Sequence, residues 1–288
     1  MIQASELILN PDGSVYHLNL KPEHIAHDII FVGDQNRVEK ISSLFDIIEF
    51  SFQKREFKTH TGTLNGKRIS VISTGIGPDN IDIVMNELDA LVNIDLKTRL
   101  PKSTLTSLNI IRIGTSGSLQ ADIPVDSFVM STYGLGIDNM LRSYLIDKIS
   151  NSNMEDLFIK HTNWDLRKGR PYVVSCSEKL KQLIESDKIQ KGITATAGGF
   201  YGPQGRVLRL GIQDDNLNSK MDNFEFEGNR ITNLEMETAA IYGLSKLLGH
   251  NALSLNAIIA NRATKTFSED PYKAVDELIK YTLDKLTK

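Results

Sequence analysis

Short apolar runs recur along the whole chain and predict a series of buried β-strands. The clearest are 28–33 (DIIFVG) and 109–114 (NIIRIG), and the segments 70–73 and 253–260 have the same character. Residues 64–67 read Leu-Asn-Gly-Lys, and an Asn-Gly pair between two such runs predicts a tight hairpin. The predicted strands are therefore spread over the whole chain.

Helical spacing of apolar residues predicts amphipathic helices between these strands. The two clearest stripes are Ile81, Val84, Met85, Leu88, Leu91 and Val92, and then Val275, Leu278, Ile279, Leu283 and Leu286. The second stripe predicts that the chain closes with a helix. Strands and helices that alternate in this way indicate one α/β domain over 1–288 with a central, largely buried mixed sheet. Residues 94–108 break the pattern and predict a surface excursion.

Composition narrows the class of protein. With 40% hydrophobic and 24% charged residues, the chain can build a core and is too apolar to be disordered. Its net charge of −3 gives no reason to expect attraction to nucleic acid or to an anionic membrane. No apolar run approaches the ~20 residues of a membrane helix, and the first residues lack a secretory signal pattern. We therefore expect a cytoplasmic protein with no nucleic-acid or membrane partner.

Several familiar kinds of site are not predicted. The single cysteine, Cys176, allows no internal disulfide and no cysteine-based zinc site. The sequence contains no GxxxxGK[ST], no GxGxxG after a strand and no HExxH. His24 and His27 are three residues apart and could share a helix face, but no third ligand is near them in the sequence. We expect them to be a solvated pair rather than a metal site.

Three predicted strands end in a glycine or a polar cluster, in FVGDQNR, IRIGTSG and IIANR. Ligands of α/β sheets collect at the carboxyl ends of strands, so Arg37, Arg112 and Arg262 should gather at one edge. Arg112 is the most informative, because a guanidinium inside an apolar strand is costly unless it meets an anion. Phosphate suits its planar fork, and backbone N–H groups at Gly33 and Thr115 could complete a cradle. An internal ion pair with a glutamate is the alternative.

A fourth segment, NLEMETAA, runs from an extended stretch into a helix and carries two carboxylates, Glu235 and Glu237. With the strand ends it forms an ordered set of blocks that resembles the nucleoside phosphorylase superfamily, and within it the uridine phosphorylases. The blocks are VYHLNL (15–20), FVGDQNRVEKI (31–41), KREF (54–57), STGIG (73–77), IRIGTSGSLQ (111–120), FYGPQGR (200–206), NLEMETAA (233–240) and IIANR (258–262). The resemblance covers nearly the whole chain. It implies a single α/β domain whose central mixed β-sheet is partly barrel-like and flanked by helices.

The resemblance also implies a phosphate site shared between subunits. Gly33, Arg37, Arg112 and Thr115 would bind inorganic phosphate, and Arg55 would reach the same phosphate from a neighbouring subunit. The protein would then be a homo-oligomer, a dimer or a hexamer, whose sites are shared across a dimer interface. Phosphate would be a substrate, and neither an organic cofactor nor a metal is implied.

A ribose site would lie beside the phosphate. Glu237, with Glu235 and Met236 next to it, would hold the ribose hydroxyls, because a carboxylate can accept hydrogen bonds from both hydroxyls of a sugar diol. His17 would cross the subunit interface to the ribose 5′-hydroxyl. These roles come from the resemblance, residue by residue.

The base would meet four residues. Phe200 would pack against it, while Gln204 and Arg206 read its edge. The Gln204 amide would accept from N3–H and donate to O2, and Arg206 would donate to O4. Arg262 would lie near the base, where purine-specific relatives carry an aspartate suited to protonating a purine nitrogen.

The activity implied is phosphorolysis of a pyrimidine nucleoside: uridine + phosphate ⇌ uracil + ribose 1-phosphate. Arg112, Arg206, Arg262 and Glu237 would be its catalytic residues. The alternatives are a purine nucleoside phosphorylase, a nucleosidase that uses water, and a non-catalytic nucleoside-binding protein. A nucleosidase would leave the arginines idle, and a binding protein would not need Arg37, Arg112, Glu237 and Arg262 together.

Overall fold

Twelve strands form one continuous sheet in the computed structural model, which describes residues 1–288. They are β1 (Asp28–Val32), β2 (Ile47–Lys54), β3 (Phe57–Leu64), β4 (Lys67–Ser73), β7 (Asn109–Ser118), β8 (Phe128–Gly136), β9 (Tyr172–Ser175), β10 (Ile189–Thr196), β11 (Glu225–Phe226), β12 (Asn229–Glu235), β13 (Asn251–Asn261) and β14 (Thr266–Phe267). Their order is β11-β12-β10-β8-β13-β7-β1-β4-β3-β2, with β9 paired to β8 and β14 to β13.

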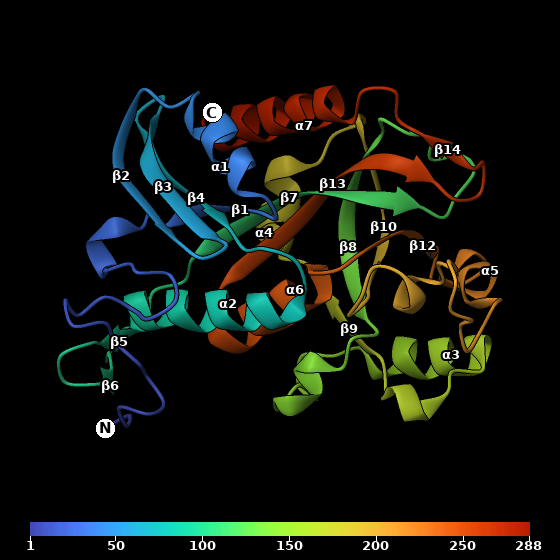
Figure 1. The fold of residues 1–288 in the computed structure, drawn as a ribbon, viewed down its shortest axis with the longest axis horizontal. Coiled ribbons are helices and arrows are strands. Elements are labelled where there is room, and N and C mark those ends of the chain that lie inside the picture. Colours follow the sequence, from blue (N-terminus) through green and yellow to red (C-terminus); the bar gives the residue numbers. More distant parts are fainter.

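Part of the sheet closes on itself. Besides its parallel pairing with β10, β12 pairs antiparallel with β7 through Asn233↔Ser118 and Leu234↔Gly117. The strands β7, β13, β8, β10 and β12 therefore form a small barrel, from which β1, β4, β3 and β2 extend as an open sheet (Figure 1). The predicted mixed sheet with partial barrel closure is confirmed.

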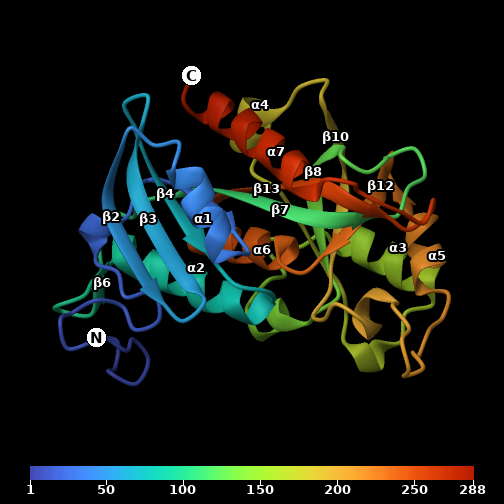
Figure 2. The ribbon, with the colours of Figure 1, turned by 45° about the horizontal axis from the view of Figure 1, so that its top comes forward.

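Seven α-helices accompany the sheet. They are α1 (Gln35–Ser42), α2 (Pro78–Asn93), α3 (Ser152–Thr162), α4 (Glu178–Ile184), α5 (Leu217–Asp222), α6 (Thr238–Leu248) and α7 (Pro271–Leu286). The helices α2 and α6 pack together on one side of the sheet and α1 and α7 lie on the other, while α3 and α5 lie at the barrel end (Figures 1 and 2). None of the helices combines the length and apolar character needed to cross a membrane.

The two helical layers explain why the strand sequences are almost continuously apolar. In β1, Ile29 and Phe31 belong to the core beneath α2 and α6, whereas Ile30 and Val32 belong to the core beneath α1 and α7. Both faces of the strand are therefore buried, as expected for a parallel sheet covered on both sides. This arrangement leaves only the ends of the strands open to ligands.

Most elements lie where the sequence places them. The predicted hairpin joins β3 to β4, and Asn65 and Gly66 have the positive φ angles of 53° and 77° that its tight turn requires. The two helical stripes lie in α2 and α7. Residues 94–108 form the surface excursion expected, with a small hairpin of β5 (Ile94–Asp95) and β6 (Leu100–Pro101).

His24 and His27 do not share a helix, so that part of the prediction is wrong. A single 3₁₀ turn ends at His24, and the chain is extended at Ile25, whose side chain is buried. The His24 ring stacks on Phe52 with centroids 4.4 Å apart, and His27 Nδ1 lies 3.3 Å from the Asn109 amide nitrogen. The two imidazoles thus serve different contacts.

Candidate active site

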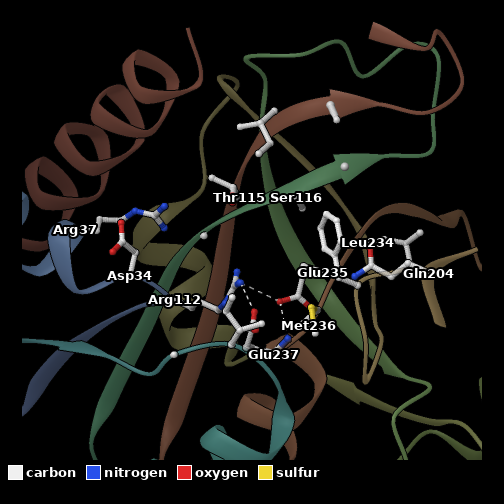
Figure 3. Close-up of a pocket in the computed structure, with 18 of the residues that line it drawn as sticks. Asp34, Arg37, Arg112, Thr115, Ser116, Gln204, Leu234, Glu235, Met236 and Glu237 are labelled. Atoms are coloured by element: carbon white, nitrogen blue, oxygen red, sulfur yellow. Dashed lines mark hydrogen bonds and ion pairs between the residues drawn. The ribbon is translucent and has the colours of Figure 1, made fainter. Parts of the chain in front are cut away.

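A cavity of about 320 Å³ opens where several strands of the sheet end. Gly33 follows β1, Thr115 lies in the last part of β7 and Ala260 near the end of β13, and all three line the cavity. The connection from β12 to α6 supplies Glu235 and Glu237. The strand ends singled out in the sequence therefore meet around one space (Figure 3).

Arg112 lines this cavity from β7 and is only 7% exposed. Its Nη2 atom is 2.5 Å from Glu237 Oε2 and 3.3 Å from Glu235 Oε2. Its Nη1 atom donates to Asn256 Oδ1 at 3.0 Å. The glutamate ion pair that the sequence left as an alternative is therefore present. Because the guanidinium also lines the cavity, the same side chain faces both the carboxylates and the space where an anion could bind.

Gly114 makes room for this arginine. A Cβ atom at position 114 would lie 1.9 Å from Arg112 Nη1 and 2.4 Å from its Cζ. Real Cβ atoms do not approach other heavy atoms so closely, so a side chain here would displace the guanidinium. The first glycine of the IRIGTSG segment therefore leaves the space that the Arg112 side chain occupies.

The two glutamates have different surroundings. Both Glu235 carboxylate oxygens accept from the backbone N–H of Thr238 at 3.0–3.1 Å, and Oε2 also accepts from the N–H of Glu237 at 3.0 Å. Glu235 Oε1 accepts in addition from Thr196 Oγ1 at 2.7 Å. Glu235 thus holds the first turn of α6, where a carboxylate is favoured.

Glu237 is the carboxylate with the fewer backbone partners. Its Oε1 accepts from the N–H of Gly77 at 2.8 Å, and its Oε2 accepts from Arg112. Burial raises the pKa of Glu237, Arg112 opposes this rise, and the charge of Glu235 adds to it. Each oxygen has a second lone pair to offer, and Glu237 lines the cavity together with Met236.

Arg37 adds a second cation at the same end of the cavity. It is held on the first turn of α1, and its Nη1 donates to the Ile113 carbonyl at 3.2 Å. Burial lowers the pKa of Arg37, and the charge of Arg112 lowers it further. Two guanidiniums that repel one another, one buried and one half-buried, favour an anion between them, beside Gly33 and Thr115.

Gln204, Arg206 and Arg262 form a connected group at the other end, which we call the clamp (Figure 3 labels Gln204). Gln204 is 2% exposed, and its Oε1 accepts from Arg206 Nη1 at 2.5 Å and from Arg262 Nη2 at 3.0 Å. Two guanidiniums can only donate, so they fix the orientation of the amide. The Arg206 guanidinium also lies 3.8 Å from the centroid of the Phe200 ring, which lines the cavity.

The clamp changes one part of the prediction for the base. The Gln204 oxygen was expected to accept from N3–H, but both of its lone pairs already face arginines. Gln204 therefore offers only the donors of Nε2. Arg262 does not line the cavity; it lies behind Gln204, where burial and the charge of Arg206 lower its pKa to about 10. The clamp as a whole presents hydrogen-bond donors.

His17 and Arg55 lie outside this cavity. His17 Nδ1 is 2.7 Å from Glu87 Oε1, beside α2, and His17 lines a different hollow. Arg55 is exposed in the turn between β2 and β3 with φ of 55°, and its carbonyl accepts from the Gln35 side chain at 2.5 Å. Within one protomer neither side chain reaches the site, and their action from a neighbouring subunit stays a prediction.

Sequence reasoning missed several apolar lining residues. Ile76 and Phe267 line the cavity although they are 71% and 64% exposed. Ile76 lies within the STGIG block, whose glycines drew attention instead. Phe267 is in β14 opposite Ala260, and no local signal predicts this two-residue strand. Asn256, which accepts a hydrogen bond from Arg112, has no sequence signal that separates it from other polar residues in strands.

Comparisons with known proteins agree on one family. A family model described as the phosphorylase superfamily matches residues 28–286. The chain is 29% identical over 258 residues to a uridine phosphorylase of Thermococcus kodakarensis, covering 90% of this chain and 81% of that protein. It is 25% identical over 272 residues to a DeoD-type purine nucleoside phosphorylase of Listeria monocytogenes, covering 93% of this chain and 97% of that one.

A solved structure is similar over almost the full length. It is a Trypanosoma brucei nucleoside phosphorylase, described as showing uridine phosphorylase activity, with a TM-score of 0.86 and 31% identity. The match covers 97% of this chain and 99% of that one. The fold, the arrangement of the strand ends and these matches agree, and the chain belongs to the phosphorylase superfamily.

Proposed function

We propose that this protein is a uridine phosphorylase, which cleaves uridine with phosphate to give uracil and ribose 1-phosphate. The observation that carries the proposal is the order of groups along one cavity. Arg37 and Arg112 lie at one end, the Glu237 carboxylate lies next to Arg112, and the Gln204 amide lies at the other end (Figure 3). A nucleoside bound beside phosphate presents its matching groups in the same order: the phosphate anion, the ribose hydroxyls and the edge of the base.

The reaction follows from where charge develops. A phosphate oxygen forms a bond to C1′ while the C1′–N1 bond breaks, and the electron pair of the broken bond moves onto the uracil ring. The uracil anion then takes up the proton that the monohydrogen phosphate loses on becoming the sugar phosphate. The sugar becomes cation-like beside the phosphate dianion, and Glu237 orients its hydroxyls. Donors of Gln204 and Arg206 stabilise negative charge on the uracil carbonyls. Preorganised donors of this kind supply about 2.7–4 kcal/mol each.

A purine nucleoside phosphorylase is the second candidate, because DeoD-type relatives match the chain at 25% identity. The clamp argues against it. Arg262 occupies the end of β13, where the resemblance places an aspartate in purine-specific relatives, and its pKa of about 10 keeps it charged at neutral pH. A charged guanidinium is a poor acid for protonating a purine nitrogen.

The test is to incubate the protein with uridine or inosine, with and without phosphate, and to measure free base. We expect uracil from uridine only when phosphate is present, and at most marginal hypoxanthine from inosine. Equal cleavage of both nucleosides would overturn the pyrimidine assignment. Base release without phosphate would indicate a nucleosidase, and no release from either would indicate a binding protein.

We expect Gly114→Ala to raise KM for phosphate by roughly tenfold or more, because the new Cβ displaces the Arg112 guanidinium and overpacking costs about 1–3 kcal/mol. Steady-state kinetics with phosphate as the varied substrate measure this. Gly198→Ala is the matched control, since its Cβ would meet nothing closer than 3.5 Å. Unchanged phosphate kinetics in Gly114→Ala would show that Arg112 need not keep its position.

A mixing experiment tests the proposed sharing of sites between subunits. If Arg55 acts on a neighbour's phosphate, inactive Arg55→Ala protein mixed with inactive Glu237→Ala protein should recover activity by subunit exchange. In each mixed dimer, one of the two sites would then have both residues intact. Exchange is followed with differently tagged subunits, and proven exchange without recovered activity would rule out a shared site.

A further inference from the structure

A second cavity, of about 380 Å³, lies behind the loop that carries Gln204. Gly202 and Pro203 of this loop line the second cavity, whereas Phe200, Gln204 and Arg206 line the first. The two cavities share no lining residue, so the loop separates them. Nothing in the proposed reaction uses the second cavity.

The wall of the second cavity is largely apolar. Ile137, Ile212 and Leu217 contribute aliphatic side chains, and Pro203 and the indole of Trp164 complete this surface. Trp164 is 9% exposed, and its indole N–H is already bonded to a backbone carbonyl at 2.8 Å. The indole therefore offers a ring rather than a hydrogen bond. A flat apolar group packs well against such a wall.

One lysine gives this apolar wall a charge. Lys168 Nζ lies 4.9 Å from the centroid of the Trp164 ring and takes part in no ion pair or hydrogen bond. The acidic residue of the wall, Asp214, pairs with Lys220 at 2.8 Å; the charge of Lys168 also lowers the pKa of Asp214, but the two side chains form no ion pair. A carboxylate on a ligand is therefore the complement that Lys168 lacks.

The geometry points to a second ligand site in this cavity, for an aromatic molecule that carries one carboxylate. Its ring packs on the apolar wall while the carboxylate pairs with Lys168. The ligand class follows from the wall alone. The effect on the first cavity, which is argued next, rests on the proposed function.

Two pairs of adjacent residues connect the second cavity to the clamp. Pro203 precedes Gln204 directly, and Leu217 precedes Asn218, whose Oδ1 accepts from Arg262 Nη1 at 3.2 Å. The cavity has this shape while the clamp is formed. A ligand that fits the second cavity favours the conformation in which the clamp is formed. Binding of this ligand should therefore lower KM for uridine. Phosphate binds at the far end and should be unaffected.

Trp164 is the only tryptophan in the chain, so its fluorescence reports on this cavity alone. Titration with 2-naphthoate, in saturating uracil and phosphate to fill the first cavity, should quench this fluorescence to a plateau. The neutral amide, 2-naphthamide, should bind about fivefold more weakly or worse, which is the scale of one partly exposed ion pair. Absence of saturable quenching would overturn the proposal.

Two variants separate the effect of the Lys168 charge from nonspecific binding. Lys168→Gln should weaken naphthoate binding by about the same fivefold and leave naphthamide binding unchanged. Arg167→Gln is the matched control, because Arg167 is on the same turn but is exposed and bound by Asp165. Equal naphthoate affinity in Lys168→Gln and the parent protein would contradict the proposal, as would an equal loss in both variants.

Kinetics then test the connection to the clamp. Saturating naphthoate should lower KM for uridine and leave KM for phosphate unchanged. An unchanged KM for uridine, with the cavity shown to be filled, would contradict the connection. A protein that cleaves no uridine would overturn the proposed function, and the fluorescence titration would still decide whether the site exists.

Discussion

Replacing Arg112 by alanine should raise KM for phosphate steeply and lower kcat, with kcat/KM falling by roughly 10²–10³. The variant removes the buried one of two cations at the anion end, and Gly33 and Thr115 offer only neutral donors in its place. It also leaves Glu235 and Glu237 buried without their counter-charge. Steady-state kinetics with phosphate varied at saturating uridine measure the effect.

Arg112→Lys separates charge from shape. A single ammonium cannot pair with Glu237, Asn256 and an anion at once, whereas the planar guanidinium already makes the first two contacts. We expect this variant to regain little activity. Thermal unfolding of both variants shows how much of the loss is global. Near-normal phosphate kinetics in either folded variant would show that Arg112 is an ion-pair partner of the glutamates and nothing more.

The second large effect is expected at the clamp. Gln204→Ala and Arg206→Ala should each lower kcat/KM for uridine by about two orders of magnitude or more, about 2.7 kcal/mol of lost transition-state binding. Arg206 reaches the cavity and also orients the Gln204 amide, so its removal takes away a donor and leaves Arg262 as the remaining partner of the amide oxygen. Kinetics with uridine varied at saturating phosphate measure both variants, and a silent Arg206→Ala would contradict the role of the clamp.

The same clamp predicts discrimination among bases. Uracil presents O2 and O4 as acceptors, which suit the donors of the clamp, whereas its N3–H meets no acceptor there. Cytosine has an amino group in place of O4, so donors would face donors, and unpaired buried polar groups are costly. The discrimination therefore rests on the O4 position, and cytidine should be cleaved more slowly than uridine. Cytidine turned over as fast as uridine would show that the amide and guanidiniums do not read the base.

The sequence predicted the elements whose signal is local. Both faces of β1 and β7 are buried, so their sequences are continuous apolar runs, and the stripes in α2 and α7 repeat at helical spacing. The strand ends could be placed together because parallel strands end at one edge of a sheet. Arg112 stood out because a charge inside such a run needs an explanation.

Other features depend on contacts between distant segments. The direct closure of the barrel rests on Asn233 and Leu234 pairing with residues of β7 more than a hundred positions earlier. The orientation of Gln204 depends on Arg262, which joins it only in the folded chain. Because the sequence does not show this contact, it predicted a free Gln204 amide whose oxygen accepts from uracil N3–H. His24 and His27 show the converse, since their spacing suits a helix but the chain is extended at Ile25 between them.

The central claim is that phosphate itself attacks the nucleoside. Uridine incubated with ³²P-labelled phosphate should give label in ribose 1-phosphate, with one labelled sugar phosphate formed for each uracil released. The label should stay in inorganic phosphate when uridine is omitted. Uracil released while all the label remains in inorganic phosphate would contradict the account.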